Sequence, residues 1–305
     1  MCASIRELAG RRAKTYTGVI RLATISDLHV DSHPEVVALV AAAIERLAPD
    51  VLVIPGDLTA DDALLERTLA ALRPGAREAI FIPGNHDLWC RAGEPDSRAR
   101  YQEIVPRRAR DAGYHVPFAD GPVRLSGHRF VGVTGWYDYS LRNRALDDVF
   151  TAEHYARGRY RVLTWSDKQR IAWPGDDGAP LGDPAICAEM VAALEGQLAA
   201  APDEPTVVVT HHLPFAELVT HRQLLPWDFI HGFLGSARLG EAIARAPGVR
   251  LAIAGHTHAR CDATIEIDGR RLRAMTSPLG YPREYRRAGR TLAEQVEARV
   301  ALVEL

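Results

Sequence analysis

The segment VLVIPGDLT, residues 51–59, joins an apolar, β-branched run to a glycine turn and an aspartate. Such a short run is typical of a strand that is buried on both faces of its sheet. Comparable runs recur along the chain, at residues 19–25, 79–82, 129–134, 206–210 and 249–254. We therefore expect a core built on sheets, with a polar turn at the end of several strands.

Helix-like patterns lie between these runs. An Ala-rich amphipathic pattern covers Pro34–Leu47, and Asp61–Leu72 opens with an acidic first turn. Asp183-Pro184 begins a third pattern that runs to about Ala200, and Ser236 is suited to cap a fourth. Strands that alternate with helices predict an α/β fold in which helices cover the sheets.

Two parts of the chain depart from this alternation. Residues 263–267 and 271–275 flank an Asp-Gly-Arg hairpin signal, and residues 300–305 are suited to a last strand. Residues 137–182 are charged and aromatic but weakly periodic, so we expect an insertion on the surface there. We predict a single domain over residues 1–305.

The composition is that of an ordinary globular protein. The 305 residues are 47% hydrophobic and 25% charged, and the formal net charge is −2. This balance makes nucleic acid and anionic membranes unfavourable partners. The four cysteines are far apart in the sequence, which indicates neither a disulfide scaffold nor a zinc ribbon. With no secretory signal and no run of about 18–20 apolar residues, we expect a cytoplasmic protein without a membrane span.

Metal-ligating residue types follow five of the predicted strands, at the carboxyl ends where open α/β sheets bind ligands. These residues are Asp27, His29, Asp57, Asn85, His86, His211, His256 and His258. In an extended chain, residues i and i+2 point to the same side, so each Asp-x-His or His-x-His pair can converge on one point. Glycines before three of these residues suit a sharp bend or a close approach to a ligand.

The donor set and its charge favour two metal ions. Oxygen and imidazole nitrogen without thiolate suit Mn, Fe or Zn better than calcium. Two divalent ions carry four positive charges, of which Asp27, Asp57 and a bridging hydroxide would neutralise three. The charge that remains would attract a phosphate anion.

The ordered series Asp-x-His, Gly-Asp, Gly-Asn-His-Asp, His and Gly-His-x-His resembles the calcineurin-like metallophosphoesterase superfamily. The match runs from Asp27 to His258, over most of the chain. The resemblance implies a four-layer α/β/β/α sandwich of two mixed sheets flanked by helices, and a hydrolase of phosphate esters with a dinuclear metal centre.

The resemblance also implies a role for each residue. Asp57 would bridge the two ions, and a metal-bridging hydroxide would attack phosphorus. His86 would be the catalytic residue that contacts the phosphate and helps the leaving oxygen to depart. One ion would be held by Asp27, His29 and His258, and the other by Asn85, His211 and His256.

The motifs favour some substrates over others. Ser/Thr protein phosphatases of the superfamily carry different residues at the positions of Val30, Ala60 and Asp87. The Gly-Asp-Leu-Thr and Gly-His-Thr-His stretches look more like bacterial phosphodiesterase-type members. We therefore expect a small-molecule phosphate ester as substrate, either a small phosphodiester or a nucleotide. A nuclease or phosphoprotein phosphatase of the same chemistry and a non-catalytic scaffold are the alternatives.

Several other residues allow two interpretations. His211 is favoured as a ligand over His212, and Asp87 could orient a histidine or serve a structural turn. Residues 136–139 could line a substrate pocket or pack against the insertion. The remaining histidines are expected to be exposed, namely His33, His115, His128, His154, His221 and His231.

Overall fold

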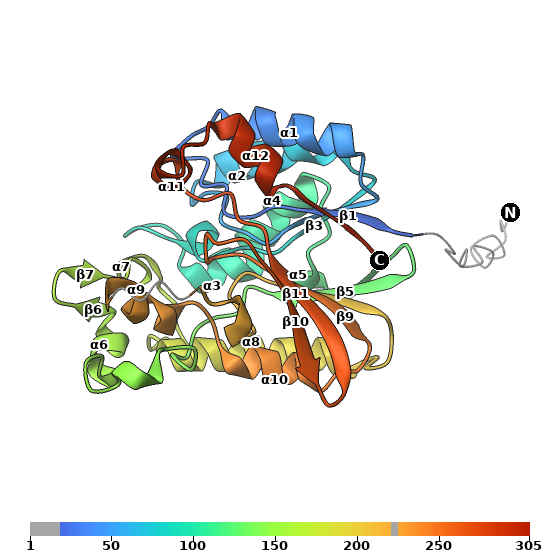
Figure 1. Cartoon of the computed structure of the whole chain (residues 1–305). Helices are drawn as coiled ribbons and strands as arrows, with labels where there is room; N and C mark the ends of the chain where they lie inside the picture. Colours follow the sequence, from blue (N-terminus) through green and yellow to red (C-terminus); the bar gives the residue numbers. More distant parts are fainter. Residues whose placement is uncertain (1–18, 221–224) are drawn as a thin grey trace, which may run out of the picture.

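Two mixed β-sheets packed face to face form the centre of the computed structural model, which describes residues 19–220 and 225–305 (Figure 1). The first sheet has the order β12-β1-β2-β3, with bounds Ala301–Glu304, Arg21–Thr24, Val51–Ile54 and Glu78–Phe81. The second has the order β10-β11-β9-β8-β5-β4, with bounds Cys261–Ile267, Arg270–Thr276, Val249–Ala254, Thr206–Thr210, His128–Val133 and Val123–Leu125. In both sheets the inner strands are parallel, and β12, β10 and β4 run antiparallel to their neighbours.

Each inner strand divides its apolar residues between two cores. Val51 and Val53 belong to the core between the two sheets, whereas Leu52 and Ile54 pack under the helices. Because successive side chains of a strand point to opposite faces, a continuous apolar run can fill both layers. This explains why the strand sequences show no polar alternation.

Helices cover the outer face of each sheet. The first sheet is covered by α1 (Val36–Leu47), α2 (Asp62–Leu72), α4 (Val105–Asp111) and α12 (Leu292–Arg299). The second is covered by α8 (Asp183–Ala199) and α10 (Ala237–Ala244) (Figure 1). The predicted four-layer α/β/β/α arrangement is confirmed. No helix in the described ranges is both long and apolar enough to span a bilayer.

The capping residues explain why the predicted helices begin where they do. The Asp61 carboxylate accepts a hydrogen bond from the Leu64 amide at 2.7 Å, and the Ser236 hydroxyl accepts one from Arg238 at 3.1 Å. Such bonds satisfy amide groups that have no partner within the helix. The predicted hairpin is also present, with β10 and β11 joined at Asp268-Gly269.

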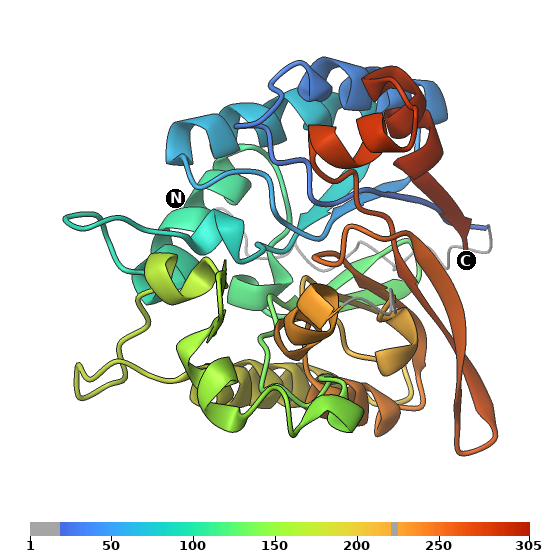
Figure 2. The same cartoon turned by 60° about the vertical axis from the view of Figure 1, so that its left-hand side comes forward.

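Residues 137–182 fold into short elements at one end of the sandwich (Figure 2). These are α6 (Ala152–Arg157), β6 (Arg159–Tyr160), β7 (Leu163–Thr164) and α7 (Asp167–Arg170). Their aromatic residues pack against α9 (Leu225–Ile230) and the turn after it, where Tyr155 stacks on Phe229 at a ring distance of 5.2 Å. Other short helices are α3 (Ser97–Ala99), a π-helical turn (Arg100–Ile104), α5 (Pro117–Asp120) and α11 (Pro282–Arg287).

Candidate metal centre

The carboxyl ends of β1, β2 and β3 in one sheet meet those of β8 and β9 in the other. The loops that follow these strands carry all seven predicted metal ligands and His86. Polar side chains from two sheets therefore converge on one place, and three overlapping groups of them could hold a metal ion.

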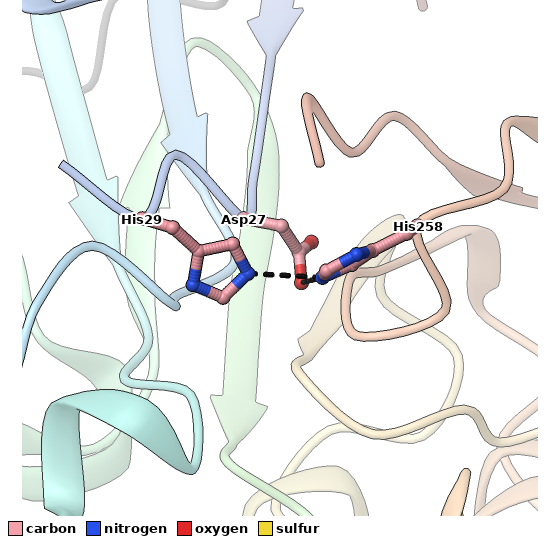
Figure 3. Close-up of side chains that lie close together, drawn as sticks. All are labelled: Asp27, His29 and His258. Carbon is pink, nitrogen blue, oxygen red and sulfur yellow. Dashed lines mark hydrogen bonds and ion pairs between the residues drawn. The ribbon is translucent and has the colours of Figure 1, made fainter. Parts of the chain in front are cut away.

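The first group contains Asp27, His29 and His258 (Figure 3). The Nε2 atoms of His29 and His258 lie 2.9 Å apart, and His258 Nε2 lies 3.5 Å from Asp27 Oδ1. Asp27 and His29 come from the loop after β1, and His258 comes from the loop after β9. This group therefore joins the two sheets.

The second group is centred on His211. Its Nε2 atom lies 3.0 Å from Asn85 Oδ1, 3.2 Å from His256 Nδ1 and 3.4 Å from Asp57 Oδ1. His212 belongs to none of the three candidate groups: its Nδ1 donates to the Thr134 carbonyl at 3.4 Å, and its ring packs among those of Trp136, Tyr137 and His256. The geometry thus supports His211 rather than His212 as the ligand.

Asp57 lies between the two groups. One carboxylate oxygen faces His211, and the other lies 4.0 Å from the Nε2 atoms of both His29 and His86. A carboxylate that faces a different set of donors with each oxygen is suited to bridge two cations. The His86 ring is also close enough to join a candidate group with His29 and Asp57.

Three of the imidazole rings are held by an oxygen on the side away from the centre. Nδ1 of His211 donates to the Pro55 carbonyl at 2.7 Å, and Nε2 of His256 donates to the Phe233 carbonyl at 3.2 Å. Nδ1 of His258 donates to Glu284 at 2.9 Å. These bonds leave the other nitrogen of each ring for the centre, which is the arrangement found around metal-binding histidines. The residues present therefore fit divalent transition metals.

The i, i+2 spacing predicts an extended backbone at the candidate ligands. The structure instead has left-handed backbone there. Positive φ angles occur at Asp27 (55°), His29 (42°), Asp57 (59°), His256 (70°) and His258 (52°). Asp and His tolerate this region better than most residues, although it costs roughly 1–3 kcal/mol each. The pairs converge because the chain turns sharply at both members, so the predicted reason for their convergence is wrong.

The protonation of the metal-free protein differs between the rings. Burial lowers the pKa of His211, but the Asp57 carboxylate outweighs this effect and raises the pKa to about 9. For His258, hydrogen bonds to Asp27 and Glu284 outweigh burial and raise the pKa to about 10. Burial lowers the pKa of His29 and His256, so both rings are neutral near pH 7. Each ligand group therefore carries one proton that a cation can replace.

Asp87 has the structural role. Its carboxylate accepts hydrogen bonds from the amides of Asp57 at 2.8 Å, Leu58 at 2.8 Å, Thr59 at 3.0 Å and Gly84 at 2.8 Å. It thereby ties the loop after β2 to the loop after β3. Burial raises the pKa of Asp87 to about 7.

The remaining histidines are not uniformly exposed. His33 and His231 are buried, which contradicts the prediction, and His33 donates to the Leu28 carbonyl at 2.6 Å. His115, His128 and His154 are partly buried, and His221 lies outside the described residues. Burial of a polar ring depends on tertiary neighbours, which periodicity does not reveal.

A cavity of about 280 Å³ opens beside the candidate ligands. Its lining includes Asp57, Asn85 and His86 together with the apolar residues Leu163, Trp165, Phe229, Ile230 and Leu234. Trp136 and Tyr137 are buried and do not line this cavity, so they pack in the core.

Four residues near the centre were missed by sequence reasoning. Tyr281 stacks on the His29 ring at 4.2 Å, and Glu284 holds His258. Trp165 and Asp167 come from the predicted insertion and line the cavity. In the sequence, Tyr-Pro-Arg-Glu at 281–284 indicates only the start of a helix, and nothing marks Asp167. A β-bridge between Ser26 and Pro278 holds the segment that carries Tyr281 and Glu284 beside the loop after β1.

Comparisons with known proteins show which family and which relatives the chain is similar to. Residues 20–260 match the family described as calcineurin-like phosphoesterase. The chain is 28% identical over 274 residues to the [acyl-carrier-protein] phosphodiesterase PptH of Mycobacterium tuberculosis (strain ATCC 25618 / H37Rv), which covers 86% of this chain and 78% of the relative.

Solved structures show the same fold. The crystal structure of phosphopantetheinyl hydrolase (PptH) from Mycobacterium tuberculosis has a TM-score of 0.66 and 25% identity, covering 93% of this chain and 95% of the other. The protein TT1561 of Thermus thermophilus has a TM-score of 0.50 at 14% identity and covers 94% and 99%, which shows a likeness of fold alone.

Proposed function

The chain belongs to the calcineurin-like phosphoesterase family and is a metal-dependent hydrolase of phosphate esters, and we propose that it cleaves phosphodiesters at a pair of divalent metal ions. The position of Asp57 carries this proposal. Its two carboxylate oxygens face two separate groups of donors, one around His29 and one around His211. Mn, Fe and Zn suit these oxygen and nitrogen donors.

The ligands divide as the family resemblance implies. Asp27, His29 and His258 would hold one ion, and Asn85, His211 and His256 the other. When bound, two such ions would activate a water molecule as nucleophile and neutralise charge on the phosphate. His86, which lines the cavity beside Asp57, would contact the phosphate and donate a proton to the leaving oxygen.

The cavity supports a small substrate. Its apolar lining residues, which include Trp165 and Phe229, can bind an uncharged substituent next to the phosphate. The two names of the relative PptH add one candidate to small phosphodiesters and nucleotides, namely a phosphopantetheinyl phosphodiester of an acyl carrier protein.

A nuclease has less support. Four of the five arginines in residues 98–110, which could attract a nucleic acid, are paired with carboxylates, including Arg108 with Glu66 at 2.5 Å and Arg110 with Asp120 at 2.6 Å. With a net charge of −2, the chain offers no general attraction for a polyanion.

The test is a metal-reconstituted activity panel. We expect about two transition ions per chain, by elemental analysis, and hydrolysis of bis-p-nitrophenyl phosphate that a chelator abolishes. The panel should compare this diester with p-nitrophenyl phosphate, cyclic nucleotides, holo-acyl carrier protein, a phosphopeptide and single-stranded DNA. Full activity after chelation would overturn the proposal.

Three variants separate metal binding from catalysis. Asp57→Asn should lose hydrolysis together with metal, whereas Asp203→Asn makes the same change at an exposed position and should keep both. His86→Ala should keep the metal ions and lower kcat roughly 10²–10⁴-fold, the usual contribution of a general acid. If His86→Ala instead loses an ion, His86 is a ligand and its catalytic role is wrong.

A further inference from the structure

Asp167 belongs to none of the family motifs, yet its side chain accepts a hydrogen bond from Asn85, one of the proposed metal ligands. It is the first residue of α7, within the predicted insertion, and only 2% of its surface is exposed. A buried carboxylate normally requires partners, because loss of hydration is costly. The partners of Asp167 show what it orients.

Each of the two carboxylate oxygens of Asp167 accepts two hydrogen bonds. Oδ1 accepts from Asn85 Nδ2 at 2.8 Å and from the Trp89 indole at 2.7 Å. Oδ2 accepts from the Trp165 indole at 2.9 Å and from the Tyr137 hydroxyl at 3.3 Å. The carboxylate is thus a common acceptor for residues of the insertion and of the loop after β3.

The bond from Asn85 fixes the orientation of its amide. An asparagine amide has a donor end and an acceptor end, and only the oxygen can bind a cation. Because Nδ2 donates to Asp167, Oδ1 turns to the centre, 3.0 Å from His211 Nε2. If the amide rotated by half a turn, the NH₂ group would face the ion.

The bond from Trp89 supports His86. The Trp89 and His86 rings are stacked with centroids 3.6 Å apart, and the indole of Trp89 is anchored on Asp167. One carboxylate therefore holds both members of the Asn85-His86 pair, the first directly and the second through Trp89.

We propose that Asp167 is a positioning residue that presents the oxygen of Asn85 to the metal bound with His211 and His256. This inference rests on the proposed dinuclear function. It predicts that Asp167 determines the affinity of one of the two metal sites and leaves the site of Asp27, His29 and His258 unaffected.

The direct test is Asp167→Asn, which keeps the shape of the side chain. Asparagine has only one acceptor oxygen. One of the two donor pairs, either Asn85 with Trp89 or Trp165 with Tyr137, would then face an NH₂ group. We expect the Mn²⁺ or Zn²⁺ site of Asn85, His211 and His256 to lose roughly 10–100-fold in affinity, the usual effect of removing such a support. Calorimetric titration of the metal-depleted protein measures both sites without relying on activity.

A matched control uses another buried carboxylate of the same region. Asp183 accepts hydrogen bonds from Trp136 and Tyr139 and pairs with Lys168, and none of these residues is a proposed ligand. Asp183→Asn should weaken the packing around Trp136, Tyr139 and Lys168 without changing the affinity of either metal site. Equal losses in both variants would show that Asp167 acts only on the folding of the segment.

A double-variant cycle tests the bond itself. In Asn85→Asp, the carboxylates at positions 85 and 167 face each other. In Asp167→Asn, the NH₂ groups at these two positions can meet. The combined variant again has a donor at one position and an acceptor at the other. We expect Asp167→Asn to weaken metal binding less in the Asn85→Asp background than in the unmodified chain. Equal effects in the two backgrounds would refute the inference.

The outcomes distinguish the inference from its premise. If the unmodified chain binds fewer than two ions, the dinuclear function itself is wrong. If it binds two ions and Asp167→Asn does so with unchanged affinities, only the role of Asp167 is wrong.

Discussion

At the residue scale, the candidate site combines left-handed backbone with hydrogen bonds that hold it. The amide of Asp57 donates to Asp87, and that of His256 donates to Asp27 at 3.0 Å. The amide of His29 donates to the Asp57 carbonyl at 3.0 Å. These contacts determine a conformation that each residue alone would avoid, and such strain is typical of functional sites.

The protons on His211 and His258 lead to a pH dependence. In the metal-free protein their pKa values are raised to about 9 and about 10, so both rings are charged at pH 7. A metal ligand must be unprotonated, so binding releases these protons and affinity should rise with pH until about pH 9–10.

We expect the release of about three protons when both sites are filled at pH 7, one each from His211 and His258 and one from the water molecule that would become the bridging hydroxide. Calorimetry in buffers of different ionisation enthalpy measures this number. Affinity that is independent of pH between 6 and 8 would contradict it.

At the element scale, the turns after the strands bring the ligands together. Gly84, after β3, lies against the loop after β2. A Cβ atom built on Gly84 would stand 2.1 Å from Asp57 Oδ1 and 2.6 Å from His211 Cε1. The turn therefore requires glycine because of a close approach between the two loops.

Gly84→Ala should push Asp57 and His211 apart. We expect at least a tenfold loss of metal affinity and a decrease of roughly 1–3 kcal/mol in the free energy of unfolding, as for other overpacked sites. Gly196→Ala is the matched control, because Gly196 is exposed in α8 with nothing near its Cβ position. That change should stabilise the chain by roughly 0.5–1 kcal/mol. Urea unfolding and metal titration measure both effects; unaltered metal binding in Gly84→Ala would contradict the geometry.

At the scale of the whole molecule, the proposed ions join the two sheets. Asp27, His29 and Asn85 follow strands of the first sheet, and His211, His256 and His258 follow strands of the second. Metal binding should therefore stabilise the packing of one sheet on the other.

A chelator should lower the melting temperature. An ion at 100 times its Kd stabilises the folded state by about 2.7 kcal/mol, so two ions contribute about 5.4 kcal/mol; at roughly 2–4 °C for each kcal/mol, we expect a decrease of roughly 11–22 °C. Differential scanning fluorimetry measures the shift. Asp57→Asn should show little response to the chelator. Equal responses of the variant and the unmodified chain would contradict a site that depends on Asp57.

Much of the layered architecture could be predicted from local sequence. The strand runs, the caps at Asp61 and Ser236 and the hairpin at residues 268–269 depend on neighbouring residues, and the structure contains them all. The short elements of residues 137–182 could not be predicted, because two-residue strands and one-turn helices show no periodicity. That residues 1–305 form one domain with an insertion there stays a prediction.

The sequence by itself determined which residue types follow which strands, and the order of the motifs led to the family. Only the tertiary structure showed that these strands belong to two facing sheets and that His211 Nε2 lies 3.0 Å from Asn85 and 3.2 Å from His256. It alone placed Glu284 on His258 and Asp167 on Asn85. The physical reason is that a ligand's type is a local property of the chain, whereas its support comes from side chains distant in sequence that burial brings within hydrogen-bonding distance.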